Sequence, residues 1–267
     1  VYRSIQGCTR LVGSGIDAVF APDLQALRPH EGQKLSAANI AALLKDSPLI
    51  QAGKSEESKR VQDAYSLRCA PQVTGAVRDT MAHAAHVARV ELVSAIDNPA
   101  VTDDLRVESN GNFHGAPVAY VLDFLAIAVA DLASMSERRT DRMLDPARSR
   151  GLNAFLANDP GVDSGYMIAQ YTQASIVSEL KRLAVPASAD SIPTSAMQED
   201  HVSLGWSAAR KLRRAVDGLG KVLGVEALTA ARAASLSSLR TDFPASSPPS
   251  SSTRVSTPRR RSHHAAE

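Results

Sequence analysis

The most distinctive polar residues of this sequence lie in three short segments, each placed just before a long helical pattern. In the first, "VQDAYSLRCAPQ", Gln62, Tyr65 and Arg68 precede a proline that suits the first turn of a helix. Because Tyr65 and Arg68 are three residues apart, one helical turn can point a phenol and a guanidinium in the same direction. The forked guanidinium matches a substrate carboxylate through two hydrogen bonds. The alternative is a surface arginine beside a packed tyrosine.

The second segment, "ESNGNFHGAPVAY", places glycine, asparagine, phenylalanine and histidine before an apolar helix. Gly111 and Asn112 can adopt left-handed backbone conformations that other residues resist, which predicts a turn that fixes the directions of Phe113 and His114. The alternative is that Phe113 is a hydrophobic staple against the helix that starts near Pro117. The residues alone leave both interpretations open.

The third segment, "PASADSIPTSAMQEDHVS", precedes the last helical pattern. Ser195 and Gln198 match a capping box, and Glu199 suits the positive end of a helix dipole. A helix cap therefore explains each residue on its own. Four consecutive polar side chains from Gln198 onward exceed what a cap needs, so this segment is also a candidate binding site.

Four long helical patterns must position these segments. Their apolar residues recur with helical spacing over about 71–98, 116–135, 163–185 and 200–233. The second pattern is apolar almost all round, so we expect a central helix covered by the others. Lengths of about 33 to 50 Å, at 1.5 Å per residue, suit an elongated all-α bundle, including one completed by other subunits. An earlier, short amphipathic helix is expected to be capped by Ser36.

Composition and charge narrow the possible classes of protein. Hydrophobic residues make up 44% of the chain and aromatic residues 4%, which favours closely packed helices over a β-sandwich. The formal charge of +2, without a basic patch in the body of the chain, argues against nucleic-acid binding. Cys8 and Cys69 fit a reducing compartment. The longest apolar run, 118–133, contains two aspartates and is too short for a bilayer. We therefore expect a soluble, cytoplasmic protein that binds no membrane.

Signatures of phosphate-binding loops, zinc proteases and nucleophile elbows are absent from the sequence. The nearest approach to a metal-binding motif is His83 and His86, three residues apart in a helical pattern. No acidic residue follows them at a suitable spacing, so we interpret the pair as part of a solvated helix face. No metal site is predicted.

Taken together, the three segments closely resemble the aromatic amino acid ammonia-lyase family. The matching stretches are "VQDAYSLRCAPQV" at 61–73, "SNGNFHGAPVAYVLDFLAIA" at 109–128, "GVDSGYMIAQYTQA" at 161–174 and the run at 181–205 that ends in "QEDHVSLG". The resemblance extends from about Ala21 to Ser235, and its long, ordered motifs make it far more specific than any single pattern. The "QEDH" favours the members that act on histidine over those that act on phenylalanine or tyrosine.

The resemblance implies a fold, an assembly and a reaction. Members of the family are long, mainly α-helical bundles, with a central helical domain like that of fumarase and aspartase. They assemble as homotetramers in which several subunits build each active site. They eliminate ammonia with an electrophilic 4-methylideneimidazol-5-one (MIO) group, which forms from an internal Ala-Ser-Gly. From L-histidine the products are urocanate and ammonia, in the first step of histidine degradation.

The resemblance also implies two catalytic residues. Tyr65 corresponds to the tyrosine beside the electrophile. Glu199 corresponds to the acidic residue that faces the imidazole and the amine of the substrate, where a carboxylate can hold a ring N–H or accept a proton.

Four further residues correspond to substrate-binding positions. Arg68 resembles the residue that binds the substrate carboxylate, and Gln62 the amide that helps position substrate and prosthetic group. Phe113 resembles the aromatic residue that lines the pocket beside the electrophile. Gln198, next to Glu199, belongs to the segment that favours histidine.

The sequence departs from the family pattern at its two ends. It contains no Ala-Ser-Gly, which in the family lies farther upstream than this chain extends. We therefore expect residues 1–52 to be the N-terminal segment of a truncated lyase, 53–238 its helical core, and 239–267 a disordered tail rich in Ser, Pro and Arg. Such a C-terminal portion is expected to be inactive alone. The alternatives are a lyase or aminomutase for phenylalanine or tyrosine, and an inactive fragment that assembles with full-length subunits.

Overall fold

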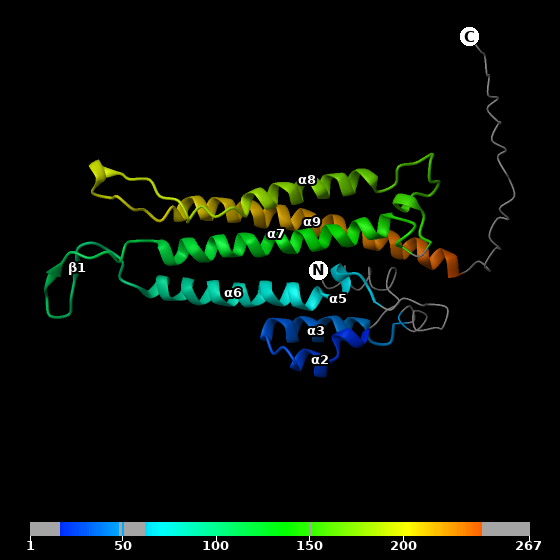
Figure 1. Ribbon diagram of the computed structural model, residues 1–267, viewed down its shortest axis with the longest axis horizontal. Helices are drawn as coiled ribbons and strands as arrows, with labels where there is room; N and C mark the ends of the chain where they lie inside the picture. The colour runs from blue at the N-terminus through cyan, green and yellow to red at the C-terminus, as the bar shows by residue number, and fades with distance from the viewer. Residues whose placement is uncertain (1–16, 48–49, 51–61, 150, 242–267) are drawn as a thin grey trace, which may run out of the picture.

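The computed structural model describes residues 17–47, 50, 62–149 and 151–241, and this part of the chain is an elongated helical bundle with one two-stranded hairpin (Figure 1). The predicted all-α fold class is therefore confirmed. In chain order the elements, with η for 3-10 helices, are η1 (Asp17–Phe20), α2 (Pro22–Ala26), α3 (Glu31–Leu44), α5 (Tyr65–Arg68), α6 (Ala70–Val93), β1 (Ala100–Val101), β2 (Val107–Glu108), α7 (Ala116–Leu144), η2 (Ala154–Leu156), α8 (Met167–Leu183), η3 (Ser195–Met197) and α9 (Gly205–Thr241).

The central helix of the bundle is α7, as its sequence predicted. It packs against α6 on one side and against α8 and α9 on the other, and α3 packs against α6 (Figure 1). Among the described helices, α7 alone is long and apolar enough, by length and composition, to cross a lipid bilayer. Its three helical neighbours explain the same composition, because the core helix of a bundle is apolar on most sides.

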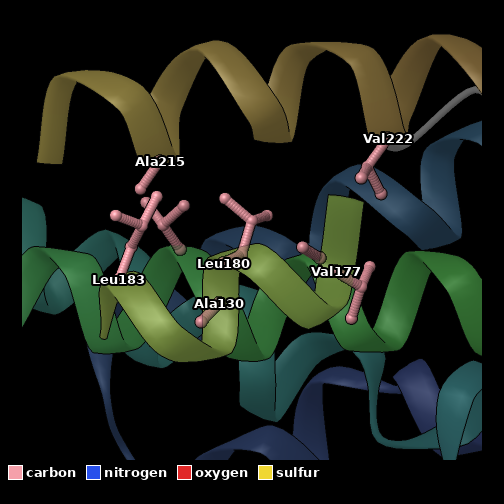
Figure 2. Close-up of a cluster of buried hydrophobic side chains, with 8 residues drawn as sticks. Ala130, Val177, Leu180, Leu183, Ala215 and Val222 are labelled. Atoms are coloured by element: carbon pink, nitrogen blue, oxygen red, sulfur yellow. The ribbon is translucent and has the colours of Figure 1, made fainter. Parts of the chain in front are cut away.

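An apolar cluster between α7, α8 and α9 forms the middle of the core. Figure 2 shows Leu180 and Leu183 of α8 facing Ala215 of α9, with Val177 and Val222 farther along the same two helices. Leucines on one helix and alanine on the other let the helices approach closely. Leu180 is 1% exposed, and burial of such a side chain stabilises the fold by roughly 1.5–3 kcal/mol.

The cap of α3 comes from a distant part of the chain. The helix begins at Glu31, and Ser36 lies buried inside it, so the predicted cap at Ser36 was wrong. Instead, the Oδ1 atom of Asp79 on α6 accepts a hydrogen bond of 2.8 Å from the backbone N–H of Gly32, 47 residues away. The carboxylate satisfies a free N–H of the first helical turn and lies at the positive end of the helix dipole.

Small side chains let α3 and α6 pack closely. A Cβ atom added to Gly32 would lie 2.3 Å from the carbonyl oxygen of Gly75, so both helices need glycine at this crossing.

The large apolar residues of α6 are not all covered within the chain: Met81 is 57% exposed and Leu92 is 84% exposed. His83 and His86 on α6 are exposed as well, as expected for a solvated helix face.

The last two helices differ from the sequence prediction mainly at their ends. The predicted start of α9 near residue 200 was wrong, because the "QEDH" segment lies in a loop and the helix begins at Gly205. The helix then continues to Thr241, beyond the predicted end at Ala233. Of the predicted tail, 242–267 lies outside the described residues.

Replacement of Gly75 by alanine is expected to destabilise the packing of α3 on α6. A Cβ atom there would lie 2.4 Å from the backbone nitrogen of Gln33, so backbone must move. We expect a loss of about 1–3 kcal/mol in the free energy of unfolding, even though alanine favours helix by about 1 kcal/mol. Urea unfolding followed by circular dichroism measures the difference.

Gly220→Ala is the matched control for this substitution. A Cβ atom at Gly220, within α9, meets nothing within 4 Å, so only the helix propensity changes. We expect stability to rise by up to about 1 kcal/mol. The same sign of effect at Gly75 and Gly220 would contradict the close crossing of α3 and α6.

Candidate functional site

The single helical turn α5 presents Tyr65 and Arg68 together, as their spacing predicted. The guanidinium carbon of Arg68 lies 4.6 Å from the centroid of the Tyr65 ring, which is a cation–π contact. Arg68 Nε donates a hydrogen bond of 3.0 Å to the carbonyl of Asp63. Tyr65 is 69% exposed, so the alternative of a packed tyrosine is wrong. Gln62, just before this turn, is exposed too.

The opposite side of α5 is held on the bundle by one apolar and one polar contact. Leu67 belongs to a buried cluster with Met143 of α7. The carbonyl of Ser66 accepts a hydrogen bond of 3.2 Å from Nη1 of Arg139, also on α7. The two middle residues of the turn therefore face the bundle, and its first residue faces solvent.

The loop before α7 is shaped by asparagine side chains. Neither Gly111 nor Asn112 has a positive φ, so the predicted left-handed turn is wrong. Instead, Asn98 Oδ1 accepts a hydrogen bond of 2.9 Å from the N–H of Asn110, and Asn110 Oδ1 accepts one of 2.8 Å from the N–H of Asn112. Asparagine side chains in this arrangement replace the backbone hydrogen bonds of a turn.

At the end of this loop, Phe113 is exposed and His114 contacts the third segment. Phe113 is 58% exposed, so the alternative of a hydrophobic staple is wrong. The rings of His114 and His201 stack with their centroids 5.6 Å apart and their planes 6° from parallel. A Cβ atom added to Gly115 would lie 3.2 Å from the Ser203 hydroxyl, which marks a second close approach. The structure thus brings the second and third segments together.

The third segment contains a tight left-handed turn. The three residues Ser195–Met197 have φ values of 49°, 53° and 73°, which cost roughly 1–2 kcal/mol for each non-glycine residue. The N–H of Thr194 donates a hydrogen bond of 2.9 Å to the carbonyl of Glu199, which closes the turn. The Thr194 hydroxyl donates to Oε2 of the Glu199 carboxylate. The turn therefore fixes both the backbone and the side chain of Glu199.

The predicted capping box of Ser195 and Gln198 is wrong. The helix α9 begins at Gly205, whose N–H donates a hydrogen bond of 3.4 Å to the Ser203 hydroxyl. Gln198 and Glu199 precede this helix and are both exposed. Their polar side chains are thus free of a capping role.

A buried carboxylate on α7 anchors the beginning of the third segment. Asp123 Oδ2 accepts a hydrogen bond of 2.8 Å from the N–H of Ser188, and Oδ1 lies 2.7 Å from Nζ of Lys211 on α9. Lys211 also donates to the carbonyl of Val185. Burial raises the pKa of the Asp123 carboxyl, but the hydrogen bonds from Lys211 and Ser188 outweigh burial and hold this pKa below its ordinary value of 3.8.

The first segment lies at the other end of the bundle from the second and third (Figure 1). Ser66 contacts Arg139, close to the C-terminal end of α7, whereas His114 precedes the N-terminal end of this helix. At 1.5 Å per residue, Arg139 lies roughly 34 Å along α7 from Ala116. One chain thus holds two separate groups of candidate residues. They are Gln62, Tyr65 and Arg68 at one end, and Phe113, Gln198 and Glu199 at the other.

Sequence reasoning missed Arg139 and Glu226, which form a buried ion pair between α7 and α9. The helical spacing of these two residues could have revealed that they are buried. Arg139 lies four residues before the buried Met143, and Glu226 lies four residues from both Val222 and Ala230, also buried. A charged residue in such an apolar stripe needs a partner, because an isolated buried charge is very costly. Within the described ranges, no group of three or more His, Cys, Asp or Glu side chains is placed to hold a metal ion.

The long helical bundle of this chain has the fold of solved aromatic amino acid lyases. The sequence matches the aromatic amino acid lyase family over residues 7–256, and the chain belongs to this family. The resemblance inferred from the three segments is therefore confirmed.

The relatives that match this chain include proteins named for histidine and for tyrosine. The chain is 68% identical over 232 residues to the histidine ammonia-lyase of Streptomyces coelicolor, and the matched region covers 87% of this chain and 45% of that protein. The crystal structure of histidine ammonia-lyase from Trypanosoma cruzi matches with a TM-score of 0.75 and 40% identity, over 90% of this chain and 45% of that one. Tyrosine aminomutase from Streptomyces globisporus matches with a TM-score of 0.79 and 38% identity, over 90% and 49%. The chain thus spans just under half the length of these relatives.

Replacement of Asp123 by asparagine is expected to destabilise the fold in a pH-dependent way. Since the folded-state pKa is lowered, the ionised carboxylate contributes stability above the ordinary pKa, and this contribution is lost as the pH falls through the folded-state value. At pH 7 we expect a loss of about 1–3 kcal/mol in the free energy of unfolding. The difference from the unmodified chain should shrink as the pH falls from about 5 towards 3.

Thermal unfolding at several pH values measures this difference. Asp131→Asn is the matched control, because Asp131 lies on the same helix but is exposed. We expect it to change stability by less than about 0.5 kcal/mol at every pH. A constant effect of Asp123→Asn between pH 3 and pH 7 would contradict the role of the charge.

Proposed function

We propose that this chain is part of a histidine ammonia-lyase, which removes ammonia from L-histidine to give urocanate. The observation that carries the proposal is the 68% identity to the Streptomyces coelicolor protein of that name. The "QEDH" segment at 198–201 supports histidine as the substrate. A lyase or an aminomutase that acts on phenylalanine or tyrosine is the alternative, and the 38% identity to a tyrosine aminomutase makes it worth testing.

The first group of residues would bind the carboxylate of histidine. Arg68 uses Nε to bond the carbonyl of Asp63, which leaves its terminal amino groups to bind a carboxylate through two hydrogen bonds. The cation–π contact keeps the Tyr65 ring beside this guanidinium. The Tyr65 hydroxyl would then exchange a proton with the substrate, and Gln62 would help to orient it.

The second group would bind the imidazole and the amine. The Thr194 hydroxyl occupies Oε2 of Glu199, so Oε1 can accept a hydrogen bond from a ring N–H or a proton from the substrate. Gln198 adds an exposed amide next to it. Phe113 would form an apolar wall of the same pocket with its exposed ring.

The residues of both groups suit the MIO group of this family by their chemistry. The exposed rings of Tyr65 and Phe113 are suited to line a small planar group. When bound, an electrophile of this kind withdraws electrons from the substrate and so assists the loss of ammonia. The 267 residues contain no Ala-Ser-Gly, so in our proposal the group comes from a segment outside them.

Assembly would bring the two groups of residues together. Because about 34 Å of helix separates the two groups within one chain, we propose a homotetramer in which different subunits contribute them to one site. The helix α7 leaves Tyr120, Phe124 and Ile127 exposed at helical spacing, 59%, 48% and 46% respectively. An apolar stripe of this kind is typical of a subunit interface. We place such an enzyme in the cytoplasm, without nucleic-acid or membrane partners.

The proposal is tested with two proteins. One is the 267-residue chain alone, and the other is the same chain joined to the upstream residues of the Streptomyces coelicolor relative. We expect only the joined protein to form urocanate from L-histidine, which its ultraviolet absorbance reveals, and to be a tetramer by light scattering.

Three outcomes would contradict parts of this proposal. Urocanate formed by the chain alone would show that it needs no further segment. A β-amino acid product from tyrosine or phenylalanine would show an aminomutase. A folded, tetrameric joined protein that converts none of these amino acids would exclude a lyase function.

Replacement of Arg68 by lysine is expected to weaken substrate binding in the joined protein. Lysine keeps the charge but loses the fork that binds both carboxylate oxygens. We expect kcat/KM for histidine to fall roughly 10- to 100-fold, the effect of one or two hydrogen bonds to a charged group. Steady-state kinetics measure it, and Arg182→Lys, on the exposed face of α8, should change kcat/KM less than about 2-fold. Equal effects at both positions would exclude Arg68 as the carboxylate-binding residue.

A further inference from the structure

We infer that Arg139 is a positioning residue for the α5 turn, through its hydrogen bond to the carbonyl of Ser66. The inference rests on the proposed function, since it is this function that assigns Tyr65 and Arg68 of the turn to the substrate. Arg139 itself is buried and touches neither the substrate nor the electrophile in our proposal. Its effect on the reaction would pass through the backbone of α5.

The guanidinium of Arg139 is fixed on two sides by buried partners. Its side chain is 1% exposed, and that of Glu226 on α9 is fully buried. Arg139 Nε lies 2.5 Å from Oε1 of Glu226, and Nη2 lies 3.0 Å from Oε2. The hydroxyl of Ser136 donates a further hydrogen bond of 2.5 Å to Oε2. Since the guanidinium is planar, two parallel hydrogen bonds to one carboxylate fix the direction of the remaining amino group, Nη1.

Nη1 is the group that reaches α5. It donates a hydrogen bond of 3.2 Å to the carbonyl of Ser66, the residue directly after Tyr65. A helix of one turn does not hold its own conformation in water, so α5 depends on contacts with the rest of the fold. The apolar contact of Leu67 keeps the turn on the bundle but is not directional. The hydrogen bond is directional, so it sets the rotation at which Tyr65 and Arg68 face outward.

The alternative is that Arg139 only stabilises the fold. Substitutions in the Arg139–Glu226 ion pair can distinguish this role from positioning of α5. Removal of one partner leaves an unpaired buried charge and is strongly destabilising, but replacement of both partners by apolar residues of similar volume is often neutral. The double variant Arg139→Met/Glu226→Leu should therefore keep the fold. It would remove the hydrogen bond to Ser66, so it separates positioning from stability.

Hydrogen exchange tests positioning without any assumption about activity. The backbone N–H groups of Leu67, Arg68 and Cys69 donate hydrogen bonds within the α5 turn. In the 267-residue chain we expect these amides to exchange roughly 10-fold faster or more in the Arg139→Met/Glu226→Leu variant, while the exchange of the α8 amides stays unchanged.

The ion pair between the buried Asp123 of α7 and the partly exposed Lys211 of α9 supplies the control. Asp123→Leu/Lys211→Met removes an ion pair at the far end of the bundle, so exchange in α5 should not change. Arg139→Lys is a second test variant, because lysine can still pair with Glu226 but has no fork to reach Ser66 as well. It should accelerate exchange in α5 like the double variant.

Kinetics of the joined protein then test the link to the substrate. If Arg139 positions Arg68, the loss of kcat/KM caused by Arg68→Lys should shrink to a few-fold in the Arg139→Met/Glu226→Leu background, because the two changes act on one contact. Independent, additive losses together with unchanged exchange in α5 would overturn the inference. Accelerated exchange in a joined protein that lacks lyase activity would uphold the positioning of α5 and contradict only the proposed function.

Discussion

The length of α7 is the constraint on which the rest of the structure depends. Its 29 residues form one uninterrupted helix that α6, α8 and α9 cover, so its two ends cannot approach each other. Each end holds one group of candidate residues: the α5 turn contacts Arg139 near the C-terminal end, and the stacked His114 and His201 lie at the N-terminal end. A rigid helix of this length fixes the two groups accurately and also keeps them apart, so the proposed site, which uses both groups, would need more than one chain.

Among the described side chains, two ion pairs join α7 to α9, and each lies beside one of these groups. Arg139–Glu226 reaches the carbonyl of Ser66 in α5, and Asp123–Lys211 holds the loop that leads to Glu199. Buried charges are weak sources of stability, since their desolvation cost is close to their attraction. In each pair, one residue also forms a hydrogen bond to the backbone of a loop or of a single helical turn. We interpret them as devices that transmit the rigidity of the core to segments with little packing of their own.

Much of this architecture follows from local sequence patterns, and what does not follow depends on distant residues. The four long helices and the central place of α7 could be predicted from apolar spacing alone. The cap of α3 could not, because Asp79 supplies it from another helix. The left-handed turn falls on Ser195–Met197, residues with no preference for it, while the loop at Gly111 and Asn112 is held by the side chains of Asn98 and Asn110. In these places tertiary contacts override local preference.

The exposure of the candidate residues is the remaining physical problem, and the proposed assembly would resolve it. Tyr65 and Phe113 are more than half exposed, yet catalysis by proton transfer gains most where water is excluded and charges are poorly screened. Within the described residues, the chain does not cover these rings itself. The same is true of Met81 and Leu92 on α6, whose apolar surface faces solvent. Exposed apolar side chains of this kind are suited to an interface, and the candidate site would become a pocket when the proposed assembly forms.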